Sequence, residues 1–480
     1  MNIFNRIAGI KILFSNKKIV LVNLTKKNQQ STLKNYKLDT PLFKKILSDE
    51  LVFLTNVFKK NNYELRIAGG AVRDLIMNIF PHDIDLATNA LPDEMIKMLN
   101  AENIRIINLN GLKHGTVPVR INDKQNFEIT TLRIDVKTYG RHAEVEFTND
   151  WHKDAIRRDL TVNSLFLDLD GTIFDYVNGV DDINNKIIKF VGIPDKRVKE
   201  DYLRILRYFR FYSRVKSDCK EHHKESLEAI RNNAEGLKII SGQRIGYELR
   251  KILSQKFCDS FMEIFYEFSL APHMGLPVNG NLEKFKNIYQ KSFKNKPLPH
   301  TLLSALMNSE EDINKLDERI KLSNDEKSTM LAIKKYENVL DSFNTVEEII
   351  EFFTKQFLIP KSSKEKSLRK EQIVELMKYL DRMDLADQIL ALELPNFPLN
   401  FKNINQHKIF DSNKQKLVTM EDYSKEYKIR LNHLISELKH KWIDSNFSLT
   451  QQDLLNLIDE KLLKEKSLYS NSKKQNKKQF

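Results

Sequence analysis

The sequence predicts an α+β protein: a mixed sheet with helices near the N-terminus, followed by a long region of helices alone. Short apolar runs bounded by polar or glycine residues, which are typical of strands, are concentrated between residues 63 and 169. Beyond about Asn279, apolar residues recur at helical spacing through most of the remaining chain. The 480 residues include only 14 Gly and 12 Pro, which favours helices over tight turns.

Composition excludes several classes of protein. A hydrophobic content of 41% with 30% charged residues is typical of soluble globular domains, and 480 residues imply roughly two to four of them. Two cysteines cannot build a disulfide framework or a cysteine zinc site, so a reducing compartment is expected. No apolar run is long enough to cross a bilayer, and no membrane partner is expected. The formal charge of +13 indicates a polyanionic partner, although charge alone does not choose between RNA, DNA and a membrane surface.

The first 38 residues differ in composition from the rest of the chain. They contain eight Lys or Arg and no acidic residue, and apolar clusters alternate with the basic ones. This composition resembles a mitochondrial transit peptide, whereas a basic arm that touches RNA is the alternative. The sequence therefore predicts a mitochondrial protein and leaves additional cytoplasmic and nuclear forms open.

The stretch from Ile67 to Thr88 carries the chemistry around which the chain is organised. A strand pattern ends at Gly69-Gly70, and a helical pattern follows. Two glycines in that position let a turn approach a ligand closely, and its amides suit a phosphate. Arg73, in the first turn of the helix, could donate to the same phosphates. Asp83 and Asp85 would share one face of the next strand, where two like charges favour a cation between them.

This order of elements resembles the catalytic palm of the polymerase-beta nucleotidyltransferase superfamily. More narrowly, GGAVRD followed by HDIDLAT resembles the class II tRNA nucleotidyltransferases, the CCA-adding enzymes of the eukaryotic mitochondrial and cytosolic type. The resemblance implies template-independent addition of CCA to tRNA 3′ ends from CTP and ATP. It also implies that Asp83 and Asp85 hold two Mg²⁺ ions and that Gly70 and Arg73 stabilise the leaving pyrophosphate.

Two alternatives stay open at this point. A poly(A) polymerase, or an enzyme that adds only part of CCA, would share the catalytic parts. A catalytically dead RNA-binding protein is disfavoured by the intact pair Asp83 and Asp85. The sequence does not distinguish a monomer from a homodimer.

The sequence also predicts the elements on either side of this stretch. An entry helix covers 39–60, and strands cover 104–109, 116–121 and 126–132. Glu128 is expected to be the third, inward-facing carboxylate if the sheet is antiparallel there, acting as a base or as a metal ligand. Residues 135–150 have weak periodicity and are interpreted as a mobile loop that contains Arg141 and His142.

The next two segments match family motifs that bind the nucleotide. The triplet Arg157-Arg158-Asp159 precedes a strand at 164–169, and the resemblance assigns Arg158 and Asp159 to the ribose and triphosphate. The run FDYVNG then matches a hinge-like element at Asp175 and Gly179.

A single helix is predicted over Glu200–Tyr212, EDYLRILRYFRFY. One acid followed by evenly spaced arginines on this helix matches the family's nucleotide-selecting motif, whose members here are Asp201, Arg204, Arg207 and Arg210. The following motif, SGQRIGYELRKIL, has Gln243 where Glu is usual, which puts local capping contacts in doubt.

These predictions divide the chain into five parts. They are a transit peptide (1–38), a catalytic head or palm (39–175), a neck with the nucleotide-selecting helices (176–275), a helical body (276–395), and a helical tail (396–480). The tail is expected to bind tRNA, whose acceptor arm the basic helices would grip by shape and phosphates, and to end in a disordered basic segment.

Overall fold

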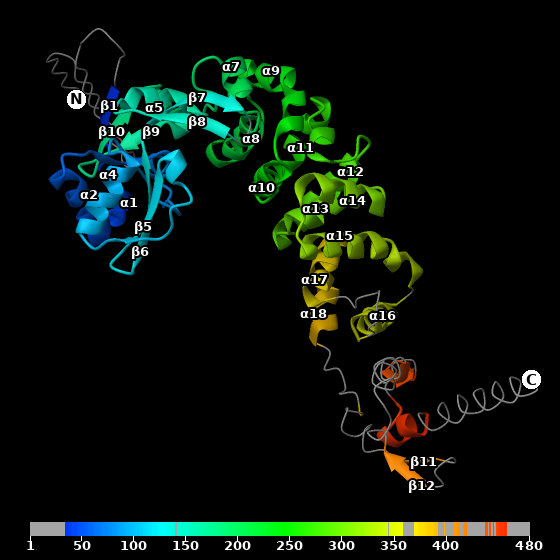
Figure 1. Ribbon diagram of the computed structural model, residues 1–480. Coiled ribbons are helices and arrows are strands. Elements are labelled where there is room, and N and C mark those ends of the chain that lie inside the picture. The colour runs from blue at the N-terminus through cyan, green and yellow to red at the C-terminus, as the bar shows by residue number, and fades with distance from the viewer. Residues whose placement is uncertain are drawn as a thin grey trace, which may run out of the picture. The chain divides into compact units, whose positions relative to one another are not determined.

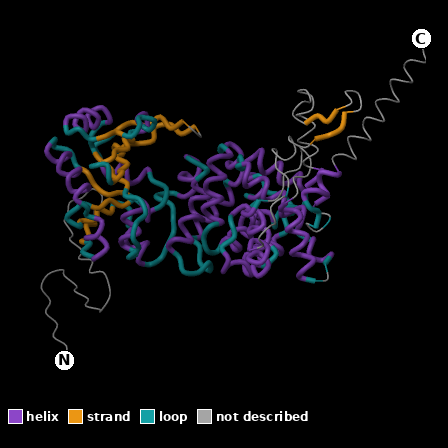
Figure 2. The backbone as a smooth tube through the Cα atoms, turned by 90° about the horizontal axis from the view of Figure 1, so that it is seen from below, coloured by secondary structure: helices purple, strands orange, loops and turns teal. Residues whose placement is uncertain are grey.

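The computed structural model describes residues 34–139, 142–343, 345–358 and 369–391, and only short pieces between 398 and 457. The chain forms two compact units. The first comprises residues 1–286 and 305–323, and the second comprises 287–304 and 324–480. Strands are gathered in the N-terminal head, and helices make up nearly all of the remaining described chain (Figure 2). The predicted α+β architecture is therefore confirmed.

The head is built on an eight-stranded mixed sheet (Figure 1). Its strands are β1 (Lys34–Lys37), β2 (Leu65–Ala68), β3 (Asp85–Thr88), β4 (Arg105–Ile106), β5 (Thr116–Ile121), β6 (Gln125–Thr131), β9 (Leu165–Leu167) and β10 (Thr172–Asp175). Their order is β1-β10-β9-β2-β3-β6-β5-β4. All neighbours are antiparallel except β3 and β6, which are parallel.

Alternation along the strands gives the sheet two different faces. Leu65 and Ile67 of β2 are buried on one face, where α2 (Asp49–Lys60) and α3 (Gly70–Ile76) pack on β2 and α4 (Pro92–Ala101) packs on β5. The register sets Arg66 opposite Ala87 on the other face. Successive side chains of a strand point to opposite faces, so Asp85 shares that second face with Ala87.

The entry helix is interrupted where the sequence predicts one continuous helix. The chain forms α1 (Pro41–Ile46) and then α2, because Ser48 begins a new helix. Its Oγ accepts a hydrogen bond from the N–H of Leu51 at 3.2 Å. A serine cap satisfies a donor that would otherwise lack a partner at a helix start.

The folded head begins earlier than the predicted boundary at residue 39. Strand β1 pairs with β10 at the edge of the sheet, and the following Leu38 is 1% exposed. The N–H of Leu38 donates to the carbonyl of Gly171 at 2.8 Å. Residues 34–38 thus belong to the head, and the leader prediction applies to 1–33, which lie outside the described residues.

The prediction of a loop over 135–150 is wrong. Strands β7 (Arg133–Tyr139) and β8 (His142–Phe147) form an antiparallel hairpin outside the main sheet. A register shift between Asp135 and Lys137 marks a bulge, which interrupts the alternation that a sequence pattern would reveal. Arg141 lies outside the described residues.

Helices continue the first unit after the head. They are α5 (Trp151–Arg157), α6 (Gly179–Asn184), α7 (Pro194–Glu200), α8 (Arg204–Val215), α9 (Lys224–Asn232), α10 (Gly242–Leu253), α11 (Cys258–Glu267), α12 (Leu282–Ser292), which runs into the second unit, and α14 (Glu310–Ile320). Short 3₁₀ turns occur at Leu112–His114 (η1), Thr161–Asn163 (η2), Ala234–Ile239 (η3) and Ala271–Met274 (η4).

The second unit is also largely helical. It contains α13 (Pro299–Ser304), α15 (Asn324–Tyr336), α16 (Val346–Leu358), α17 (Lys370–Tyr379) and α18 (Met383–Ala391), with 3₁₀ turns η5 (Phe293–Asn295) and η6 (Val339–Ser342). The tail is not all helical as predicted, since β11 (Lys408–Asp411) and β12 (Lys416–Thr419) form a two-stranded ribbon. Of the predicted helix at 430–442, residues 437–439 and 441–442 are described, and they are helical. In the described part of the chain, no helix has the length and apolarity to traverse a bilayer.

Candidate active site

The Gly69-Gly70 turn joins β2 to α3 in a conformation that requires glycine. Gly69 has φ +67°, and a Cβ there would lie 3.1 Å from Nη1 of Arg158. Its N–H donates to the carbonyl of Leu165 in β9 at 2.9 Å. The turn is thus fixed to the neighbouring strand and lies directly against one of the predicted nucleotide-binding arginines.

Asp85 and Glu128 are brought side by side by the sheet. Asp85 is the first residue of β3 and lies directly opposite Glu128 of β6 in a parallel register. The prediction assumed an antiparallel neighbour, and the observed pairing is parallel, yet both side chains still point to one face. Asp83 precedes the strand. Its side chain is 81% exposed and lies 3.0 Å from Nδ1 of His82.

The carboxylates crowd one another. Loss of hydration, followed by repulsion from Glu128 and Asp83, raises the pKa of Asp85, and Arg158 opposes the shift. A carboxylate destabilised by like charges is stabilised when a divalent cation binds between them, so the donor set fits Mg²⁺. Among the described residues, however, no three His, Cys, Asp or Glu side chains already converge as a metal site.

Arg73 lies beneath the turn rather than at its surface. Its side chain is 3% exposed, and its Nε and Nη2 donate to Oδ1 of Asp74 at 3.0 and 2.8 Å. Its Nη1 donates to Oδ1 of Asn163 at 2.5 Å. Nη2 also lies 3.6 Å from the position of a Cβ at Gly70. In this arrangement the guanidinium of Arg73 bonds to Asp74 and Asn163, and its charge lies close to the turn.

A buried aspartate that was not predicted as a site residue holds the side chains of Arg157 and Arg158. Asp154 in α5 accepts from Nε of Arg157 at 2.9 Å and from Nε of Arg158 at 3.0 Å. Burial alone would raise the pKa of Asp154, but the charges of these arginines hold it below its usual range. The spacings of three and four residues could have indicated the cluster, since such residues share a helix face.

Asp159 is already engaged by the neck. Its Oδ2 accepts from Nε of Arg207 at 2.6 Å, and its Oδ1 accepts from the N–H of Leu160 at 2.9 Å. Burial is the largest single influence and opposes ionisation, but Arg207, the N–H of Leu160 and the charge of Arg204 together lower the pKa of Asp159 to about 2. The carboxylate is therefore ionised at neutral pH, and it links the predicted ribose contact to the nucleotide-selecting helix.

The predicted helix over 200–212 is divided at Asp201. Helix α7 ends at Glu200, and α8 begins at Arg204. Asp201 adopts an extended conformation, and its Oδ1 accepts from the N–H of Leu203 at 3.1 Å. An aspartate side chain that bonds to a nearby backbone N–H competes with helix continuation, which accounts for the break.

Asp201 and Arg204 have different partners in this structure. Oδ2 of Asp201 accepts from Nη2 of Arg244 at 2.6 Å. The buried Arg204 donates to Glu200 at 2.5 Å and to the carbonyl of Arg157 at 3.1 Å. The two predicted base-reading side chains are thus close in sequence without being paired to each other here.

Arg207 and Arg210 share a buried acceptor that was also missed. Glu248 of α10 accepts from Nη1 of Arg210 at 3.1 Å and lies 3.8 Å from Nη1 of Arg207. Arg210 additionally lies 5.7 Å from the ring of Tyr247, which is 54% exposed. Glu248 lies in the motif at 241–253, yet sequence alone gives no sign that it is buried.

The hinge-like element at Asp175 and Gly179 forms a helix start. Asp175 accepts hydrogen bonds at 3.0 Å from the N–H groups of Val177, Gly179 and Val180. A Cβ at Gly179 would lie only 2.3 Å from the carbonyl oxygen of Thr161, so glycine is required there.

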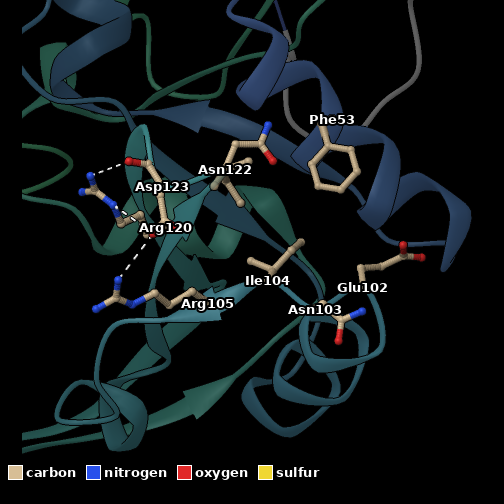
Figure 3. Close-up of a pocket in the computed structure, with 9 residues that line it drawn as sticks. Phe53, Glu102, Asn103, Ile104, Arg105, Arg120, Asn122 and Asp123 are labelled. Carbon is tan, nitrogen blue, oxygen red and sulfur yellow. Dashed lines mark hydrogen bonds and ion pairs between the residues drawn. The ribbon is translucent and has the colours of Figure 1, made fainter.

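One small pocket lies elsewhere on the head (Figure 3). It encloses about 170 Å³ between Phe53 of α2, the end of α4 and the β5–β6 turn. Asp123 lies 3.4 Å from Arg105 and 3.6 Å from Arg120 at its rim. None of the predicted catalytic or nucleotide-binding residues lines it.

Two family models match the chain. Residues 65–189 match "Poly A polymerase head domain", which spans the turn, the carboxylates and the Arg157–Asp159 segment. Residues 222–275 match "Probable RNA and SrmB- binding site of polymerase A".

Similar proteins cover most of the chain. The "CCA tRNA nucleotidyltransferase 1, mitochondrial" of Danio rerio is 41% identical over 427 residues, which span 88% of this chain and 93% of that protein. The protein of the same name from Homo sapiens is 41% identical over 423 residues, 88% of this chain and 92% of its own.

Solved structures share the fold. The CCA-adding enzyme of Bacillus stearothermophilus in complex with CTP has a TM-score of 0.61 at 21% identity, covering 89% of this chain and 100% of that chain. The Thermotoga maritima CCA-adding enzyme complexed with tRNA_CCA has a TM-score of 0.53 at 18% identity, covering 88% and 98%.

Proposed function

Because the chain belongs to the CCA tRNA nucleotidyltransferase family, we propose that it adds C, C and A to tRNA 3′ ends from CTP and ATP without a nucleic-acid template. The observation that carries this proposal is the register of β3 and β6, which sets Asp85 beside Glu128. Two adjacent carboxylates, one of them with a raised pKa, are typical of a catalytic site and are not needed for RNA binding alone.

Magnesium is the cofactor that fits the donor set. Asp83 and Asp85 would hold two Mg²⁺ ions, since hard divalent cations prefer carboxylate oxygens. The bound ions would neutralise the carboxylates and the triphosphate and make the α-phosphate more electrophilic. The raised pKa of Asp85 supports this role, because loss of hydration and then repulsion from Glu128 and Asp83 cause it, and a bound cation offsets both.

The chain's own groups would orient the reactants. The tRNA 3′-hydroxyl attacks the α-phosphate, and pyrophosphate leaves. Glu128, beside Asp85, would orient the hydroxyl or accept its proton. The amides of the Gly69-Gly70 turn and the adjacent Arg158 would take up charge on the leaving group, with Arg73 adding positive charge from beneath.

The neck would hold and select the nucleotide. Asp159 would contact the ribose, and Arg207, which bonds to Asp159, and Arg210, which bonds to Glu248, would bind the nucleotide beside it. Asp201 and Arg204 would read the base edge after exchanging their present partners, Arg244 and Glu200. A carboxylate that accepts and a guanidinium that donates match the amino group and ring nitrogen that C and A share.

The tRNA would be bound through its acceptor arm by the neck, the body and the tail. The formal charge of +13 supports attraction to the phosphate backbone. Mitochondrial location is proposed from the composition of residues 1–33 and from the printed names of the relatives.

Nucleotide addition to a defined transcript tests the function. The purified protein is given a tRNA lacking CCA with labelled CTP, labelled ATP, or both. We expect two C residues with CTP alone and a finished CCA end with both. Unlimited extension by ATP alone would identify a poly(A) polymerase, and addition of only C or only A would identify a partial enzyme. No addition at all would refute the proposal.

A further inference from the structure

One buried carboxylate joins the phosphate turn to the nucleotide-selecting helix. Asp74 in α3 is 4% exposed. Its Oδ1 accepts from Nε and Nη2 of Arg73 at 3.0 and 2.8 Å. The same carboxylate accepts from Nε of Arg214 at 3.1 Å and from Nη2 of Arg214 at 2.6 Å. Arg214, which is 140 residues from Asp74 in the chain, thus shares this acceptor with Arg73.

The two guanidinium groups lie in different parts of the proposed site. Arg73 lies beneath Gly70 and donates to Asn163, whose carbonyl accepts from Arg158 at 3.4 Å. Arg214 lies in the last turn of α8, the helix that carries Arg204, Arg207 and Arg210. The Asp74 carboxylate is therefore the shared link between the phosphate side and the base-selecting side.

A second contact supports the same connection. The ring of Phe211 in α8 lies 4.9 Å from the guanidinium of Arg73, 5.1 Å from that of Arg207 and 5.0 Å from that of Arg210. With Arg207 bound to Asp159, helix α8 is fixed to the head near its start and at its end. Such double attachment restricts rotation of the helix about either contact.

The proposed reaction requires a fixed distance between helix α8 and the phosphate turn at Gly69-Gly70. The base is to be read by α8 while the α-phosphate of the same nucleotide lies at the carboxylates of the head. An error of about 1 Å in such an alignment can lower a rate about a hundredfold. Charge-assisted, two-point arginine–carboxylate bonds define both distance and orientation, which single contacts do not.

We propose that Asp74 and Arg214 are positioning residues that hold α8 in register with the phosphate turn, so that base selection and phosphoryl transfer occur in one geometry. This rests on the proposed function. Neither side chain needs to touch the nucleotide for the effect. The pair sets where the contacting residues lie.

The test uses Arg214→Ala, because the Arg214 side chain is 37% exposed and Asp74 keeps Arg73 as a partner. We expect kcat for C and A addition to fall at least tenfold, while the KM for tRNA and the Tm stay near wild type. The preference for CTP over UTP should also fall, and Arg214→Lys should restore part of kcat. Arg105→Ala is the matched control, since it removes an exposed pair with Asp123 in the same unit.

A double-mutant cycle separates coupling from general damage. Asp74→Asn combined with Arg214→Ala should be no slower than the slower single variant if both act through their contact. The proposal would be overturned if kcat for Arg214→Ala stayed within twofold of wild type, or if the effects of the two substitutions simply multiplied. It would also be overturned if Arg214→Ala lowered Tm but left kcat per folded molecule and the preference for CTP unchanged. Failure of the function itself would appear instead as a wild-type protein that adds neither C nor A.

Discussion

Asp85 of β3 and Glu128 of β6 lie directly opposite each other in the only parallel pairing of the described eight-stranded sheet. The two residues are 43 positions apart in the chain. The intervening α4, β4 and β5 return the chain so that β6 lies beside β3 and runs in the same direction. Loss of hydration raises the pKa of Asp85, and the pairing adds repulsion from Glu128 in the same direction.

Replacing Asp83 or Asp85 with Asn should abolish incorporation of C and A alike while tRNA binding persists. Loss of a metal-binding carboxylate removes charge stabilisation worth several kcal/mol, about a thousandfold or more in kcat. Single-nucleotide incorporation and a tRNA binding assay measure the two effects. The exposed Asp93→Asn in α4 is the matched control and should be active. Appreciable activity in either catalytic variant would refute the metal assignment.

Arg204→Ala or Asp201→Ala should weaken discrimination against UTP and GTP, not merely lower the rate. U and G present a carbonyl and a ring N–H where C and A present an amino group and a ring acceptor. A mismatched buried polar group costs about 1–3 kcal/mol, so discrimination should fall about tenfold. Arg244→Ala, which removes the present partner of Asp201, should alter the same ratio.

Competition between labelled CTP and UTP measures this ratio directly. The exposed Lys199→Ala in α7 serves as the control and should keep the wild-type ratio. A variant at Arg204 or Asp201 that loses activity with C and A but keeps its selectivity against U and G would show that these residues do not read the base.

Residues 1–33 fused to a reporter should direct it to mitochondria, and 1–38 should do no better. The sheet begins at Lys34, so the shorter segment contains all of the leader that is not part of the head. Replacing its basic residues with Gln should abolish import. Initiation at Met77 would remove Gly69, Gly70 and Arg73, so it cannot supply an active cytosolic form. Fluorescence microscopy reads the outcome, and a purely cytosolic reporter rejects the leader.

His222 should make folding stability depend on pH. Burial, with a smaller contribution from Lys216, lowers the pKa of His222 to about 4, and its ring stacks on Tyr212 at 4.1 Å. Nδ1 of the ring lies 3.1 Å from the Tyr208 hydroxyl, and Nε2 lies 3.8 Å from Sγ of Cys219. Unfolding restores a pKa near 6.5, so the unfolded chain binds the proton more tightly.

Stability from this residue is therefore fully present above about pH 6.5 and is lost as the pH falls toward 4. After allowance for partial solvent exposure, the loss by pH 5 should be on the order of 1–2 kcal/mol. Urea midpoints at pH 7.5, 6 and 5 measure it, and His222→Gln should flatten the dependence. The exposed His82→Gln should not. Equal slopes in wild type and His222→Gln would contradict the assignment.

The sequence by itself determined the local order of elements and the kind of chemistry. Strand, Gly69-Gly70, helix and paired aspartates are encoded within some twenty residues, and helical periodicity identified the neck and body. The hairpin at 133–147 was missed because a two-stranded ribbon outside the main sheet carries a weak pattern, further interrupted by the bulge at Asp135. The break at Asp201 was missed because the apolar residues keep helical spacing across it. The break depends instead on a hydrogen bond from the N–H of Leu203 to the Asp201 side chain.

Only the tertiary structure decided which charged groups meet. Asp159 with Arg207, Glu248 with Arg210 and Asp74 with Arg214 are pairs separated by 48, 38 and 140 residues. A sequence pattern reports periodic burial along one element, whereas such pairs depend on how separate elements pack and on which carboxylates lose water. For that reason the sequence, which placed Arg73 in the first turn of a helix, gave no sign that its side chain is buried against a carboxylate that also bonds to Arg214 of α8.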